Sequence, residues 1–488
     1  MHYISGEDRK QVQMFNTLDD LINKQHYIRL IDLLSDRFVT DNGNLFTHKG
    51  SSELGRKAFH PAVLLNIFIY GYFNGIASSR KLEKECHRNL EMMWLTKKLC
   101  PDHKTISDFR KEHSESIRGI VRKFTELLKN SNYIKGQIIS IDGTKVKAYA
   151  GMSISLEGIE NKLEDIDNQM EQYLEKLQTI DQHEEENEQL EAQKQELNHQ
   201  VEDLQKQIEE LGKQKDMLQA TGVDKLSPTD TDARIMKARH GKFFAYNVQM
   251  VVDTAHHFIA YTEATSAQND KGQLQPVVEK VERILQTTPK EVLADSGYEF
   301  WEQLTYLEKI KNINCYVAIN GNKYINNQSE EGVKFTYDEK NNYYICPENK
   351  LLLPKHGIKR DSKRKTESQV YTASDCMGCV QKPECTTAQN RTITRHSDQI
   401  QRDNYISKMN SKTGKQKMRQ RKATVEHPFA TIKYLMGQIP LLLRGKLKVQ
   451  IEINLYTLAY NFKRLLNMAS FDQIAEMITG NKWEIKTV

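Results

Sequence analysis

A long helical insertion is the feature that most restricts how this 488-residue chain can fold. Between residues 156 and 220, apolar residues recur at spacings of four and three, which is the pattern of coiled-coil helices. The polar run DQHEEENEQ at 181–189 breaks that pattern. One continuous helix of this length would reach roughly 90 Å, and the dozen residues after it could not bring the chain back. The sequence therefore predicts an antiparallel coiled-coil hairpin over residues 154–225, with its tip around His183 to Glu188.

The segments on either side of this hairpin predict one mixed sheet. Upstream, YIKGQIISID is rich in β-branched residues and indicates a strand that ends near Asp142. Downstream, residues 242–265 predict a strand hairpin that turns near Asp253 to His256. A helix at 273–285 and a strand at 291–295 follow. Strands interrupted by helices indicate an α+β core, with a first part at 131–153 and a second part at 226–320.

The N-terminal residues 1–130 are predicted to be helical throughout. Apolar residues recur at helical spacing in four runs, at 18–34, 60–75, 78–89 and 104–128. Short helices with several basic residues on or near one of them fit a helix-turn-helix DNA-binding domain; these are Arg80, Lys81, Lys84 and Arg88. An ordinary helical bundle fits the same pattern.

Residues 321–400 are predicted to be an irregular insertion that bears cysteines. Its four cysteines follow a C-x29-C-x2-C-x5-C spacing, at Cys346, Cys376, Cys379 and Cys385. Four thiolates can bind Zn²⁺ tetrahedrally and stabilise a segment without an obvious core, although a second C-x2-C is missing. A structural zinc site and four free thiols both remain open. The other three cysteines are expected to be small buried hydrophobic residues; they are Cys86, Cys100 and Cys315.

The charge distribution points to a polyanionic partner. The net charge is only +5, but residues 156–220 hold nineteen acidic residues against six lysines, so the rest of the chain carries a surplus of 18 positive charges. Such a surplus favours phosphate contacts, although a solvated lysine-rich surface also fits. The sequence has no apolar run long enough for a membrane span and no secretory signal, and its odd cysteine number indicates a reducing compartment. We expect a cytoplasmic protein.

Three acidic residues stand in positions suited to metal chemistry. Asp142 and Asp295 each end an apolar strand and are followed by Gly or Ser-Gly, which places a carboxylate at the rim of a sheet. Two such carboxylates repel unless a divalent cation lies between them. Glu426 is the third: residues 402–448 contain twelve Lys or Arg but only one other acid, Asp403. Pro428 predicts that the helix either kinks after Glu426 or begins anew near it.

Taken together, these motifs resemble bacterial insertion-sequence transposases of the DDE superfamily. The resemblance extends over nearly the whole chain and rests on IISIDGTKVKA, TDTDARIMK, LADSGYE and VEHPFATIK, together with the helical N-terminal block. It implies an RNase H-like catalytic core that includes a basic helical part at 401–465, followed by a C-terminal tail at 466–488. The family pattern around the glutamate is Tyr-x2-Arg-x3-Glu-x6-Lys. This chain has Arg419 and Lys422 at its first two positions, with Arg421 as another substitute.

The resemblance also implies a reaction and its partners. Asp142, Asp295 and Glu426 would hold two Mg²⁺ ions, which Mn²⁺ can replace, for nicking at transposon ends and strand transfer into target DNA. DNA contacts are expected from six basic residues: Lys145, Lys147, Arg419, Arg421, Lys422 and Lys433. The coiled-coil arm would join a homodimer, or else serve as an acidic spacer. A metal-dependent nuclease without strand transfer, or a non-catalytic DNA-binding regulator, remains an alternative.

Overall fold

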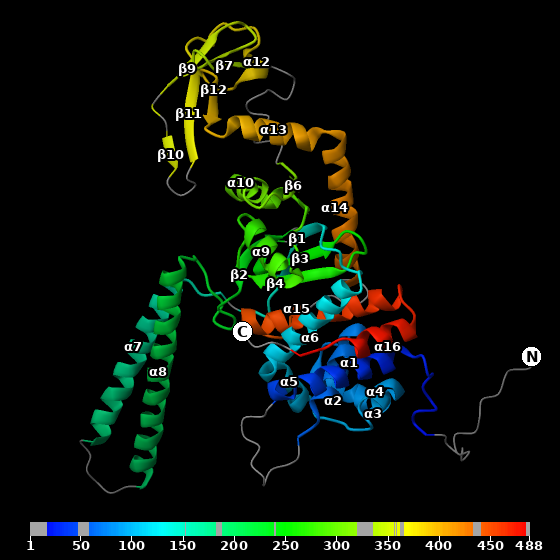
Figure 1. Ribbon diagram of the computed structural model, residues 1–488. Coiled ribbons are helices and arrows are strands. Elements are labelled where there is room, and N and C mark those ends of the chain that lie inside the picture. Colours follow the sequence, from blue (N-terminus) through cyan, green and yellow to red (C-terminus); the bar gives the residue numbers. More distant parts are fainter. Residues whose placement is uncertain are drawn as a thin grey trace, which may run out of the picture.

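The fold combines a helical layer, a mixed sheet, a helical hairpin and a second sheet (Figure 1). The computed structural model describes residues 17–46, 58–151, 153–181, 188–238, 241–319, 335–355, 357, 359–361, 366–432 and 441–484. Within them, no helix is both long enough and apolar enough to cross a membrane.

The helical layer is built around one helix that is apolar on every side. This helix, α2 (Pro61–Phe73), is buried at nearly every position and packs against both α1 and α15. The segment expected to be one helix at 104–128 forms two, which meet at His113. The layer contains α1 (Tyr27–Asp41), η1 (Gly43–Phe46), α2, α3 (Ser79–Arg88), α4 (Leu90–Leu95), α5 (His103–Glu112) and α6 (Ser114–Asn130).

The C-terminal residues belong to the same layer. Helix α15 (Lys446–Leu466) packs between the helical layer and the sheet, and α16 (Phe471–Gly480) packs on α1. Trp483 is only 1% exposed, and its backbone is held by Asn42 and Asp41. Residues 466–484 of the expected tail are therefore an integral part of the N-terminal domain, because the Trp483 side chain is buried in its core.

The mixed sheet has the predicted strands and hairpin. Strand β1 pairs antiparallel with β3 and parallel with β5, β3 pairs antiparallel with β4, and β5 pairs parallel with β6. The elements are β1 (Ile138–Lys147), β2 (Arg234–Ala238), β3 (Gly241–Asp253), β4 (Ile259–Thr265), α9 (Leu274–Leu285), β5 (Glu291–Ala294), η2 (Ser296–Tyr298), α10 (Trp301–Lys309) and β6 (Asn314–Val317). One prediction was wrong: β1 does not end near Asp142 but continues to Lys147, because the long strand β3 still pairs with it there.

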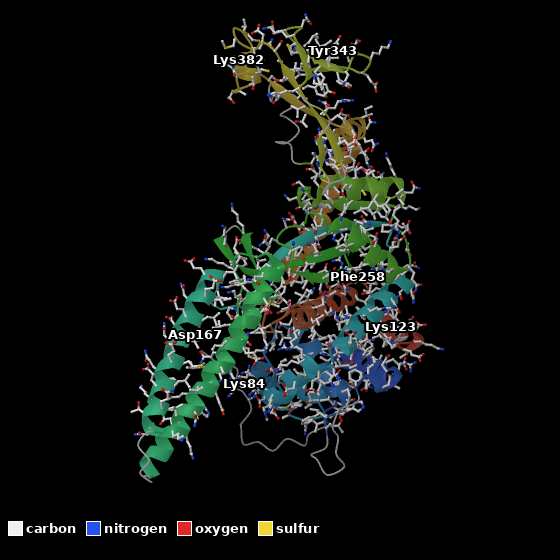
Figure 2. All side chains as sticks on the ribbon, turned by 90° about the vertical axis from the view of Figure 1, so that its left-hand side faces the viewer. Lys84, Lys123, Asp167, Phe258, Tyr343 and Lys382 are labelled. Carbon is white, nitrogen blue, oxygen red and sulfur yellow. The ribbon has the colours of Figure 1, made fainter. Side chains whose placement is uncertain are left out.

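The insertion after β1 forms two long antiparallel helices. Helices α7 (Leu156–Asp181) and α8 (Glu188–Thr221) pack on each other, and at their base Ile154 pairs antiparallel with Leu226. A row of apolar side chains fills the contact between them, including Ile159, Ile166, Leu204, Leu211 and Leu218. Figures 1 and 2 show this hairpin standing out from the sheet, with Asp167 on α7. Most of the predicted tip lies outside the described residues.

The cysteine-bearing insertion forms a second sheet, so the prediction of an irregular segment was wrong. All its pairings are antiparallel, in the order β10-β11-β9-β8-β7, with β12 added to β11. The elements are β7 (Thr336–Asp338), β8 (Tyr343–Ile345), β9 (Leu351–Pro354), β10 (Lys359–Asp361), β11 (Thr366–Ala373), α12 (Lys382–Cys385) and β12 (Thr392–His396). Most of these strands span only three to five residues, which is too short to give a periodic signal.

Two helices connect the second sheet back to the first. Helix α13 (Gln399–Asn410) and helix α14 (Lys412–Ala430) meet at Ser411, and α14 then packs against β1, β3, β5 and β6. Figure 1 shows α14 beside the sheet and the second sheet beyond it; in Figure 2, Tyr343 and Lys382 mark that end of the molecule. Helix α14 does not restart at Pro428, which lies inside it.

Candidate active site

The register of two parallel strands brings Asp142 and Asp295 to the same level of the sheet. Ser140 on β1 pairs with Leu293 on β5. Each aspartate lies two residues further along the chain, so both lie at the same level of the sheet, where β5 ends. In both residues Oδ1 accepts a hydrogen bond from a nearby glycine N–H: Gly143 for Asp142 and Gly297 for Asp295, at 2.9 Å each. The second oxygen of each carboxylate is therefore the one available to a shared cation.

A guanidinium group occupies the position of that cation. Arg421 on α14 places Nη2 3.1 Å from Asp142 Oδ2 and 3.7 Å from Asp295 Oδ2. Burial raises the pKa of Asp142 to about 6; Arg421 opposes this shift, and the negative charges of Asp295 and Asp270 add to it. Positive charge beside Asp142 favours its ionised form, and Arg421 supplies one unit of it.

A third carboxylate that the sequence did not reveal lies in the same place. Asp270, in the loop between β4 and α9, accepts hydrogen bonds at Oδ1 from Asn247 Nδ2 at 2.8 Å and Gln249 Nε2 at 2.7 Å. Both amides come from β3 and are buried. The hydroxyl of buried Tyr298 donates in turn to Gln249 Oε1. Asp270 is thus held by a hydrogen-bonded network that starts in the core of the sheet.

The glycines after the two aspartates make room for this carboxylate. A Cβ atom at Gly143 would lie 2.2 Å from Asp270 Oδ1, which is closer than real contacts allow. A Cβ atom at Gly297 would lie 3.2 Å from Asp270 Oδ2 and 3.0 Å from Asp295 Oδ1. The Asp-Gly and Asp-Ser-Gly motifs therefore do more than form turns: they let Asp270 approach the backbone beside Asp142 and Asp295.

Comparison with protein-family models gave two matches. Residues 16–112 match a transposase domain (DUF772), and residues 345–466 match a transposase DDE domain. The chain belongs to the DDE transposases. Searches of curated proteins and of solved structures gave no match. The first match covers most of the helical layer, and the second runs from the second sheet through α14 and α15.

In this transposase, Glu426 does not join the two aspartates. It lies five residues after Arg421 on α14, which turns it by about 140° around the helix. Its side chain is 63% exposed, and Glu426 Oε1 lies 3.8 Å from Lys422 Nζ. The next residue, His427, is held by Tyr460 and Arg464 of α15, which fixes this orientation. Within the described residues, no three His, Cys, Asp or Glu side chains are already gathered closely enough to hold a metal ion.

The basic residues expected to contact DNA have different surroundings. Lys147, Arg419 and Lys422 are exposed, as such contacts require. Lys145 donates to the backbone oxygen of Lys237 at 2.6 Å. Arg421 is turned inward to the aspartates, because its side of α14 packs on the sheet. Lys433 lies outside the described residues.

The seven cysteines of the transposase divide as the sequence predicted, with one exception. Cys86 and Cys315 are buried, but Cys100 is exposed, so its predicted burial was wrong: it follows α4 in a surface loop. The other four are all half-buried in the second sheet and its loops; they are Cys346, Cys376, Cys379 and Cys385.

Proposed function

We propose that this transposase nicks DNA at the ends of its transposon and joins the freed strand to target DNA. The observation that carries the proposal is that Asp142 and Asp295 share one cation, the guanidinium group of Arg421. Each of the two carboxylates directs one oxygen at this group. Hard oxygen donors in this arrangement suit Mg²⁺ or Mn²⁺. The family match supports a DNA substrate.

The topology of the sheet supports an RNase H-like core. Two parallel strands, β1 and β5, carry the aspartates, while β3 and β4 extend the sheet on the antiparallel side. The long insertion after β1 and the second sheet after β6 both leave this core uninterrupted. We infer that the two insertions serve DNA handling or assembly, and that the chemistry belongs to the mixed sheet.

The metal-binding residues of the proposed site are Asp142 and Asp295, with Asp270 beside them. When bound, Mg²⁺ would activate water or a 3′-hydroxyl and stabilise the leaving oxygen of the phosphodiester. The protein's part is to hold the carboxylates in register, and the local N–H groups of Gly143 and Gly297 do this. When a metal binds, Arg421 would have to leave its place between Asp142 and Asp295 or contact the substrate phosphate there.

Glu426 remains the proposed third ligand, and Asp270 is a candidate that already lies beside the pair. For Glu426 to reach the pair, α14 must rotate or shift along its axis. Such a shift would carry Arg421 out and would break the contacts of His427 with Tyr460 and Arg464. Asp270 needs no such movement, because Asn247 and Gln249 already orient it. The two residues can be separated by mutation.

We further propose that the helical layer binds DNA through α3. Arg80, Lys81 and Lys84 are exposed on it, whereas Leu82 and Cys86 pack inward. Lys84 lies on the surface of the helical layer in Figure 2. Helices α7 and α8 bury their apolar rows against each other and are acidic outside, so a homodimer through this arm would need a complementary basic surface.

The decisive experiment incubates the protein with Mg²⁺ and DNA bearing candidate terminal repeats and looks for strand-joined products. Asp142→Asn, Asp295→Asn and Glu426→Gln should each reduce joining by roughly 1000-fold or more while DNA binding persists. Asp224→Asn, the same change at an exposed aspartate outside the site, is the matched control and should keep activity.

The other outcomes identify the alternatives. Cleavage without joined product would indicate a nuclease, and tight binding without either would indicate a regulator. Activity that survives Glu426→Gln but not Asp270→Asn would make Asp270 the third ligand. Activity that survives Asp142→Asn would refute the proposed site.

A further inference from the structure

We propose that Cys346, Cys376, Cys379 and Cys385 bind one structural Zn²⁺ ion that holds the second sheet together. This inference does not depend on the proposed catalytic function. The sequence spacing left zinc and free thiols equally open. What favours zinc is the arrangement of backbone and polar contacts around the sulfur atoms of Cys346 and Cys376, together with a contact that links Cys385 to them.

Cys346 lies in a tight turn whose backbone amide points at its sulfur. The N–H of Lys350 donates to Cys346 Sγ at 3.2 Å, and the N–H of Asn349 donates to the Cys346 carbonyl at 2.9 Å. Asn349 has a left-handed backbone with φ of 56°, which closes the turn. An amide aimed at a sulfur stabilises the thiolate, the form of cysteine that binds metal.

The C-x2-C pair forms a second turn, and there the amide that reaches a sulfur comes from another segment. Gly378 between the two cysteines has φ of 76°, a conformation that favours glycine. Cys376 Sγ accepts a hydrogen bond from the N–H of Arg391 at 3.4 Å. Two separate segments therefore present a sulfur together with an amide donor.

Polar contacts join these turns into one cluster. Lys350 Nζ donates to the carbonyl of Asp375, directly before Cys376, at 2.9 Å. Arg391, whose N–H reaches Cys376 Sγ, also donates from its guanidinium to the carbonyl of Cys385 at 3.0 Å. These contacts link the segments that carry Cys346, Cys376 and Cys385.

Among the described residues, the second sheet has only a small hydrophobic core. Its buried hydrophobic cluster has five members, Tyr344, Leu352, Tyr371, Ala373 and Ile393, and Cys346 and Cys376 pack against it. Small units with so little buried apolar surface are commonly stabilised by disulfides or metals. Four sulfur donors select Zn²⁺ among the abundant divalent ions. The four side chains are not yet gathered closely enough to hold an ion, so zinc binding would draw them together around the turns that are already in place.

The test measures metal content in the full-length protein purified under reducing conditions from zinc-supplemented medium. Elemental analysis should give one zinc per chain. Replacement by Co²⁺ should give the thiolate charge-transfer band and the visible bands of tetrahedral cobalt. Serine in place of any one of Cys346, Cys376, Cys379 or Cys385 should lower the zinc content at least tenfold. Cys100→Ser, at an exposed cysteine outside the cluster, should retain the full content.

Each result bears on the inference. A wild-type protein without zinc, or one in which iron replaces zinc or two disulfides join the four cysteines, would overturn it. Zinc retained in the cluster variants would also overturn it. If the serine variants are insoluble, the cobalt spectrum of the wild-type protein still decides, because four sulfur ligands and mixed ligands give different charge-transfer intensities.

Discussion

The two sheets of this transposase are stabilised in different ways. The mixed sheet shares one large hydrophobic cluster with the helical layer, in which residues from β1, β5, α2 and α15 are completely buried. In its described residues, the second sheet has a cluster of five buried hydrophobic residues and four cysteines. A sheet with a large core can use polar residues for chemistry, because its stability does not depend on them. A sheet with a small core needs its polar and sulfur atoms for stability.

Removing zinc should produce the largest difference in stability between the two sheets. Structural zinc in small domains is worth about 10–16 kcal/mol of binding free energy. We therefore expect a strong chelator to abolish amide hydrogen-exchange protection in β8, β9 and β11 while β1, β3 and β5 stay protected. Equal protection in both sheets after metal removal would show that the second sheet is stable by itself.

A cavity in the mixed sheet should lower the stability of the mixed sheet and the helical layer. Ile141 is fully buried on β1, so Ile141→Ala should cost about 2–5 kcal/mol and lower the stability of the sheet and the helical layer together. Ile393→Ala, at a buried position on β12, should affect only the second sheet. Denaturant unfolding followed by hydrogen exchange distinguishes the two variants. A loss of stability in both sheets from Ile393→Ala would contradict separate cores.

The third change tests whether polar positions of the mixed sheet serve chemistry. Asp270→Asn keeps the shape and the acceptor for Asn247 and Gln249, so stability should change little, but strand joining should fall about 10- to 100-fold. Gly143→Ala should reduce strand joining at least as much, because the added methyl group would collide with Asp270.

Gly212→Ala on α8 is the matched control for Gly143→Ala, because a methyl group there meets nothing within 4 Å. It should leave strand joining unchanged and stabilise the helix by about 0.5–1 kcal/mol. Thermal unfolding and the joining assay, measured on the same preparations, check all three variants. Full activity of Gly143→Ala would show that Asp270 need not occupy that space.

The smallest effects are expected on the exposed face of α14. Lys422→Ala removes a side chain that is 72% exposed and pairs loosely with Glu426, so stability should change by about 0–1 kcal/mol. If Lys422 or Arg419 contacts a phosphate, each alanine variant should lower the slope of log affinity against log salt by about 1. An unchanged salt slope would assign these residues to solvent.

Much of the architecture could be predicted because its signals are local. The return path of the arm followed from the helical rise and the broken heptads, and the strands that carry Asp142 and Asp295 followed from apolar runs before glycine. The second sheet escaped prediction because most of its strands span only three to five residues and give no periodic signal. The helices at 104–128 could not be separated, because apolar spacing continues through the break at His113.

The sequence by itself determined the residue types of the site and the segments that carry them: two aspartates on strands, a glutamate in a basic helix and four cysteines in one insertion. Only the tertiary structure decided which of them meet. Strand register brought Asp142 and Asp295 together, α14 turned Arg421 toward them and Glu426 away, and β3 amides placed Asp270 beside them. These outcomes depend on register and helix rotation between segments distant in the chain, which no local pattern encodes.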